Sequence, residues 1–103
     1  MAKLYNLISN QIIKKYNIND ININGITCDS RKIKKGYIFA VFRGVNRNGL
    51  NYINEAIRKG AVALLIDKKD IKNKNCFSKI EIIPSSLPRK IYALICNKFN
   101  NYQ

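Results

Sequence analysis

Histidine and tryptophan are both absent from this 103-residue chain, and the lack of histidine removes several kinds of site. Without an imidazole there is no Ser-His-Asp or Cys-His arrangement and no histidine-ligated zinc. Acidic residues are also few, with six Asp and Glu against 19 Lys and Arg. These six are widely spaced and form no convincing carboxylate pair. We therefore expect no catalytic residue and no metal ligand, and the composition favours a binding domain over a complete catalyst.

Long hydrophobic runs are lacking as well. No apolar stretch reaches the roughly 18 residues of a membrane span, and the first residues show neither the apolar region nor the cleavage site expected of a secretory leader. The three cysteines, Cys28, Cys76 and Cys96, are odd in number and show neither metal-knuckle nor redox-pair spacing. We expect a reduced, cytoplasmic protein without a membrane partner. Cys28 and Cys96 are expected to be small buried hydrophobic residues.

The formal net charge is +13. Such a charge has two explanations, a nucleic-acid or anionic membrane partner on one side and a compositional bias on the other. The lysines are scattered among many Asn and Ile residues and form no stripe interleaved with aromatic side chains. We favour the compositional explanation, because scattered charges usually lie on solvated faces. A small basic nucleic-acid-binding protein remains the alternative.

The length suits a single domain over residues 1–103. Apolar spacing predicts a helix over 2–16, a helix between Asn51 and Gly60, and a last helix capped by Ser86. Its buried stripe is predicted to comprise Ile91, Leu94, Ile95 and Phe99. Continuous apolar runs predict strands over 25–28, 37–42, 61–66 and 79–83.

The second and third of these strands flank a helix, so they should be parallel with a right-handed crossover. The predicted fold class is α/β: a small sandwich with a mixed, partly parallel sheet and two or three flanking helices.

The most specific pattern lies between residues 27 and 49. Thr27-Cys28-Asp29-Ser30-Arg31 forms a polar turn after one strand, and Gly44-Val45-Asn46-Arg47-Asn48-Gly49 follows the next. The glycine spacing lacks the Lys-Ser or Lys-Thr of a phosphate loop, so a nucleoside triphosphate site is not expected here.

Ser30 has two interpretations. Its hydroxyl either holds the turn or faces a polar ligand at the carboxyl end of a strand, where open α/β sheets bind ligands. Asp29 and Arg31 have the same alternatives, and we favour a structural role for both. Residues 45–47 are a solvated loop by default, although the Asn46 amide could bind the edge of a heterocycle.

The combination resembles the N-terminal domain of the Mur ligases, the ATP-dependent amide ligases that build the peptidoglycan stem peptide. The likeness rests on Gly25-Ile26-Thr27-x-Asp29-Ser30-Arg31, on Gly36-x-Ile38-Phe39-Ala40-Val41-x-x-Gly44, and on Asn48-Gly49-x-x-Tyr52-Ile53 continuing to Gly60-Ala61. Within the family, the spacing and the Pro88-Arg89 helix are most similar to the ligase that extends UDP-N-acetylmuramoyl-L-alanyl-D-glutamate to the tripeptide. The D-alanyl-D-alanine-adding ligase is the alternative.

The resemblance implies that this domain binds the UDP part of a UDP-N-acetylmuramoyl-peptide. Ser30 and the backbone of Cys28 would contact the uridine end, and Val45, Asn46 and Arg47 would belong to the loop that closes over it. The turns would be supported by Asp29, Arg31, Gly44 and Gly49. Where the family usually has Asp before the second glycine, this chain has Asn48, which also tolerates a turn.

The family's phosphate loop, magnesium ligands and amino-acid-recognising domain would all follow Gln103. We therefore expect this segment to bind neither ATP nor Mg²⁺, to anchor substrate only, and to have no ligase activity alone. The central prediction is geometric: Ser30 and the 45–47 segment should converge at one edge of the sheet. The sequence leaves the oligomeric state and the added amino acid open.

Overall fold

A four-stranded parallel sheet lies at the centre of the fold, in the order β3-β4-β5-β6. The computed structural model describes residues 2–43, 49–71 and 80–100. The strands are β3 (Gly25–Thr27), β4 (Tyr37–Ala40), β5 (Ala63–Asp67) and β6 (Glu81–Ser85). β4 and β5 are joined through α2 (Ile53–Arg58), so the predicted parallel strand–helix–strand unit is confirmed.

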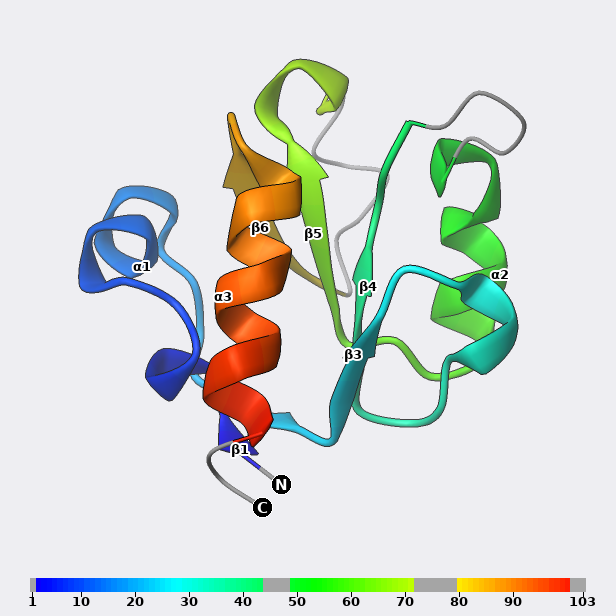
Figure 1. Cartoon of the computed structure of the whole chain (residues 1–103), viewed down its shortest axis with the longest axis horizontal. Coiled ribbons are helices and arrows are strands. Elements are labelled where there is room, and N and C mark those ends of the chain that lie inside the picture. Colours follow the sequence, from blue (N-terminus) through cyan, green and yellow to red (C-terminus); the bar gives the residue numbers. More distant parts are fainter. Residues whose placement is uncertain (1, 44–48, 72–79, 101–103) are drawn as a thin grey trace.

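Both faces of this sheet are covered (Figure 1). Successive strand residues point to opposite faces, so Ile38 and Leu65 belong to one core cluster and Phe39 and Leu64 to the other. The helix α3 (Pro88–Asn100) covers the first face together with the N-terminal segment, and α2 covers the second. The predicted α/β fold class is confirmed: the parallel sheet is accompanied by a separate antiparallel pair and three α-helices in the described residues.

The expected helix over 2–16 is wrong in its first half. Ala2–Lys3 forms β1, which pairs antiparallel with β2 (Asn22–Ile23), and Leu4–Asn6 is a 3-10 turn. The α-helix α1 covers only Asn10–Tyr16, and Ser9 caps it by accepting the Ile12 N–H at 3.3 Å. The helix-like spacing of the early leucines arises because a 3-10 turn also places residues three apart on one side. Ser9 was the available sequence signal for the true start.

Two details of the later helices also differ from prediction. Asn51 is not the cap of α2, because a 3-10 turn over Gly49–Tyr52 precedes the helix and Tyr52 occupies the cap position. Leu94 does not belong to the buried stripe of α3: it is 46% exposed, whereas Ile95 is fully buried. Pro88 opens α3 as expected. In the described ranges, no helix has the length and apolar character needed to cross a membrane.

Candidate functional site

The segments that follow β3, β4, β5 and β6 all emerge at one edge of the sheet, because the four strands are parallel. In open α/β sheets, this carboxyl edge is where ligands bind. The polar turn after β3 and the start of α3 after β6 both lie here and line one cavity, and a second cavity lies between the start of α3 and the segment after β5.

The turn after β3 is held by Asp29. Its carboxylate accepts hydrogen bonds from the Arg31 backbone N–H at 3.0 Å and from the Arg31 Nε and Nη2 at 3.0 and 2.9 Å. These contacts raise the pKa of Arg31, through the hydrogen bond to Asp29 first and its charge second. Asp29 and Arg31 therefore bind each other and shape the turn that presents Ser30.

Ser30 is buried, with 2% of its surface exposed, and its hydroxyl donates to Glu55 Oε2 at 2.9 Å. Lys59 lies beside the pair, 3.1 Å from Glu55 Oε1 and 3.4 Å from the Ser30 carbonyl oxygen. The hydrogen bond from Ser30, followed by that from Lys59, lowers the pKa of Glu55. An ionised carboxylate can only accept, so the Ser30 hydrogen points to Glu55. What the Ser30 oxygen can offer a ligand is its lone pairs, which suit an N–H donor.

This contact has a pH dependence of known sign. The pKa of Glu55 is lower in the folded chain than its ordinary value of 4.5, so its stabilising contribution is complete above that value and is lost as pH falls through the lower, folded pKa. We expect Glu55→Gln to flatten the acid limb of the stability curve below about pH 4.5, measured by urea unfolding at several pH values. An acid limb of the same slope in Glu55→Gln and wild type would contradict the contact.

The Ser30 cavity, a hollow of about 280 Å³, opens beside this turn. Its wall residues come from four parts of the chain: Cys28, Asp29, Ser30, Phe39, Phe42, Gly49, Tyr52 and Arg89. Cys28 is exposed, so the expectation that it is a buried hydrophobic residue is wrong. It directly follows the last residue of β3, which is an edge strand of the sheet. Cys96, on α3, is partly buried, and burial raises its pKa.

Gly49 closes the segment that begins after β4. Its N–H donates to the Phe42 carbonyl oxygen at 2.8 Å, and a Cβ at this position would lie 2.9 Å from the Phe42 backbone N and O. Only glycine allows this close approach. The predicted site residues Gly44, Val45, Asn46 and Arg47 lie outside the described residues. Phe42, two residues before Gly44, and Gly49, two residues after Arg47, both line the Ser30 cavity.

The Phe42 ring is fixed from two directions. Tyr92 packs edge-on against it, with ring centroids 5.4 Å apart and planes at 86°, and the Arg89 guanidinium lies 4.5 Å from its centroid. Burial, with smaller effects from Cys96 and Cys28, raises the pKa of Tyr92 to about 12, so the phenol stays neutral.

Sequence reasoning missed Glu55, Phe42 and Arg89 as site residues. Glu55 showed no signal, because its role depends on a contact with Ser30 across 25 residues of sequence. Phe42 is the last residue of one predicted strand and Arg89 comes shortly after another, so the parallel order could have placed both at this edge.

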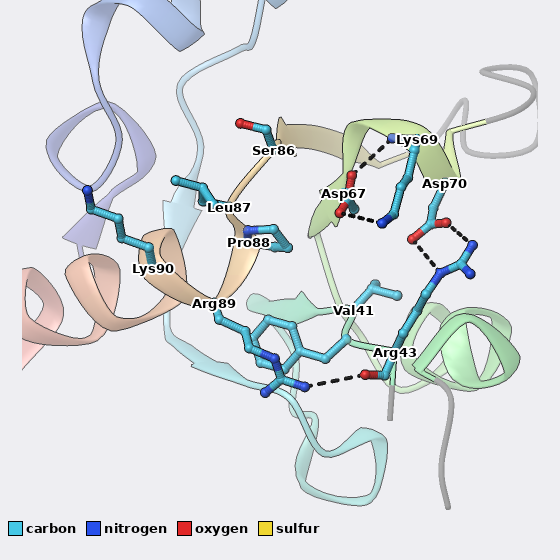
Figure 2. A pocket seen from close by; sticks show the side chains of 11 residues that line it. Val41, Arg43, Asp67, Lys69, Asp70, Ser86, Leu87, Pro88, Arg89 and Lys90 are labelled. Atoms are coloured by element: carbon cyan, nitrogen blue, oxygen red, sulfur yellow. Dashed lines mark hydrogen bonds and ion pairs between the residues drawn. The ribbon is translucent and has the colours of Figure 1, made fainter. Parts of the chain in front are cut away.

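A second hollow, here called the β5 cleft, lies on the other side of Phe42 and Arg89. Figure 2 shows it between the start of α3 and the segment that follows β5. Its volume is about 340 Å³. Asp70 pairs with Arg43 across it, Asp67 accepts the Lys69 N–H at 3.1 Å, and the wall residues are Val41, Phe42, Arg43, Asp67, Lys69, Asp70, Ser86, Leu87, Pro88, Arg89 and Lys90.

Metal-binding groups do not gather in the part of the chain that the structure describes, where no three Cys, Asp or Glu side chains are placed to share an ion. The site is therefore a pair of polar and apolar hollows with a buried hydroxyl, a stacked arginine and several lysines. Such an arrangement can bind and orient a polar, anionic ligand.

The sequence is similar to that of known proteins. Residues 22–97 match the family model described as "Mur ligase family, catalytic domain". The UDP-N-acetylmuramoyl-L-alanyl-D-glutamate--2,6-diaminopimelate ligase of Fusobacterium nucleatum is 41% identical over 66 residues, which are 64% of this chain and 13% of that protein. The ligase of the same name from Clostridium tetani is 33% identical over 95 residues, 92% of this chain and 18% of that protein.

A further relative bears a different name. The UDP-N-acetylmuramoyl-tripeptide--D-alanyl-D-alanine ligase of Rickettsia prowazekii is 40% identical over 58 residues, 55% of this chain and 13% of that protein. The chain belongs to the Mur ligase family, whose members named here are ligases of peptidoglycan synthesis. The matched regions span less than a fifth of each of these relatives.

Proposed function

We propose that this chain anchors the UDP end of a UDP-N-acetylmuramoyl-peptide for a ligase of peptidoglycan synthesis. The observation that carries the proposal is the buried Ser30 hydroxyl, oriented by Glu55 in a cavity at the carboxyl edge of the sheet. The family resemblance assigns the uridine contact to this serine. In this role the chain binds substrate, while ATP and Mg²⁺ bind elsewhere in a complete ligase.

The chemistry of the cavity suits a uracil ring. Uracil carries one ring N–H donor between two carbonyl acceptors, and the Ser30 oxygen is an acceptor because its hydrogen is bonded to Glu55. The aromatic side chains of Phe42 and Tyr52 line the same cavity and provide apolar surface for a planar ring. The contacts that the resemblance assigns to Val45, Asn46 and Arg47 are part of this proposal.

The proposed parent enzyme is the ligase that adds the third residue of the stem peptide. The relatives from Fusobacterium nucleatum and Clostridium tetani are both named for addition of 2,6-diaminopimelate to UDP-N-acetylmuramoyl-L-alanyl-D-glutamate. The second candidate is the D-alanyl-D-alanine-adding ligase, which is supported by the similarity to the relative from Rickettsia prowazekii.

The proposal is tested by titrating the chain with UDP-N-acetylmuramoyl-L-alanyl-D-glutamate and following backbone amide shifts by NMR. We expect the largest shifts at Cys28, Asp29, Ser30 and Gly49, because they line the Ser30 cavity. No shift at millimolar ligand, or shifts confined to α1 on the other side of the molecule, would overturn the proposal.

Ser30→Ala should weaken uridine binding by about three- to tenfold, since one hydrogen bond contributes about 0.5–1.5 kcal/mol. Ser86→Ala is the matched control, because Ser86 is an exposed serine of the β5 cleft and does not line the Ser30 cavity. Isothermal titration with uridine measures both. Equal affinities for Ser30→Ala and Ser86→Ala would show that the hydroxyl makes no contact with the ligand.

A further inference from the structure

We propose that Arg89 binds the diphosphate of the substrate and that the β5 cleft takes the sugar beyond it. This inference rests on the proposed function, because it extends the ligand of the Ser30 cavity into the neighbouring hollow. Arg89 lines both the Ser30 cavity and the β5 cleft, and among the described residues that line them only Phe42 shares that position. The stacked pair Phe42–Arg89 thus forms the wall between the two hollows.

The order of parts in the ligand matches the order of parts in the protein. A nucleoside diphosphate sugar has uridine at one end, the sugar at the other and the two phosphates between them. The Ser30 cavity, at about 280 Å³, is just below the usual range of pockets for drug-sized ligands, about 300–1,000 Å³, and cannot enclose the whole molecule. A ligand with its uridine beside Ser30 therefore extends across the Phe42–Arg89 wall. This places its two phosphates beside the Arg89 guanidinium.

Arg89 is chemically available for this role. All six acidic residues lie in the described part of the chain, and each already binds another residue. The partners are Tyr5 for Asp20, Arg31 for Asp29, Ser30 and Lys59 for Glu55, Lys69 for Asp67, Arg43 for Asp70, and Asn19 for Glu81. No carboxylate in those ranges pairs with Arg89, whose Nη2 donates a long hydrogen bond of 3.4 Å to the Arg43 carbonyl oxygen.

The surroundings also hold the guanidinium in place. Stacking on Phe42, which Tyr92 supports from its edge, limits the rotation of the Arg89 side chain before any ligand arrives. A planar guanidinium forms paired hydrogen bonds to phosphate oxygens, which an ammonium cannot reproduce. By contrast, Arg43 and Lys69 of the β5 cleft are paired with Asp70 and Asp67. Arg89 is therefore the cation at this edge best suited to the phosphates.

The test compares uridine, UDP and UDP-N-acetylmuramoyl-L-alanyl-D-glutamate as ligands of the 103-residue chain. Uridine should shift only amides of the Ser30 cavity, UDP should add shifts at Arg89 and Lys90, and the full substrate should add Val41 and Leu87. Arg89→Gln should weaken UDP binding by roughly tenfold to a hundredfold while changing uridine affinity by less than about twofold. Arg89→Lys should keep only part of the preference for UDP over uridine. The positive charge remains, but the planar guanidinium that forms paired hydrogen bonds is lost.

Arg58→Gln is the matched control, because Arg58 is an exposed helical arginine on α2 that lines neither hollow. It removes the same charge and should change UDP affinity by less than about twofold. The inference is overturned if Arg58→Gln and Arg89→Gln weaken UDP equally, or if Arg89→Gln weakens uridine as much as UDP. If the unmodified chain binds uridine and UDP equally well, the role of Arg89 fails and the uridine site stands. If it binds neither, both proposals fail.

Discussion

Ile95→Ala is expected to lower the free energy of unfolding by about 2–5 kcal/mol, the usual result of removing a large aliphatic side chain from a closed core. Ile95 is fully buried on the face of α3 that packs against the sheet. Its neighbours in the cluster include Ile38, Leu65 and Ile83, which belong to three different strands. A cavity at this point removes contacts that connect the helix to the whole sheet, so the surrounding structure can relax only in part.

Leu94 is the matched control for this experiment. It precedes Ile95 on the same helix, yet it is 46% exposed, so Leu94→Ala should change the free energy of unfolding by less than about 1 kcal/mol. Urea unfolding followed by circular dichroism measures both variants. Equal losses would mean that α3 is rotated relative to the sheet, with both residues in the core. A loss below 1 kcal/mol for Ile95→Ala would contradict the packing of α3.

Gly60→Ala is expected to be the second large effect, a destabilisation of about 2–4 kcal/mol. Gly60 has φ +115°, a conformation that side chains rarely adopt, and an added Cβ would lie 2.6 Å from the Lys35 Cα and 3.0 Å from the Lys35 N. The neighbouring Gly36 N–H donates to the Gly60 carbonyl oxygen at 2.9 Å. The two turns therefore touch through their backbones, and neither can move without loosening the start of β4 or the end of α2.

Asn17 provides the control for a left-handed backbone position that already carries a side chain. It ends α1 with φ 53°, and its N–H donates to the Ile13 carbonyl oxygen. Asn17→Gly should be neutral or stabilising by up to about 1 kcal/mol, because glycine adopts this conformation without a Cβ penalty. Thermal unfolding of both variants measures the contrast. A Gly60→Ala protein as stable as the wild type would show that the approach to Lys35 is not as close as described.

Local signals were sufficient for most of the elements. The apolar runs of β4 and β5 and the glycine at the end of α2 predicted a parallel strand–helix–strand unit, which the sheet register confirms. Residues 2–9 were mispredicted because burial of Leu4 and Leu7 has the same spacing in a 3-10 turn as in an α-helix, whereas the helix predicted over 10–16 is present. The start of the chain is a strand because of a contact distant in sequence, the pairing of Ala2 with Ile23.

Only those parts of the candidate site that lie close together in the sequence were predicted. The polar turn around Ser30 and the closing Gly49 were recognisable from residue types and from the family resemblance. Their common cavity is described in the structure, whereas the predicted contribution of residues 45–47 remains a prediction. Glu55 and Arg89 came from helices separated from Ser30 by 25 and 59 positions, and no spacing rule connects residues so far apart.

The sequence by itself determined the class of this protein: an α/β member of the Mur ligase family, without histidine chemistry, whose polar turns lie beside buried strands. Those features follow from residue types and short spacings, because these determine the conformation of the backbone nearby in the sequence. Only the tertiary structure decided which partners meet at the carboxyl edge of the sheet. The Ser30–Glu55 hydrogen bond and the Arg89–Phe42 stack exist because packing α2 and α3 on opposite faces brings their side chains to the same edge.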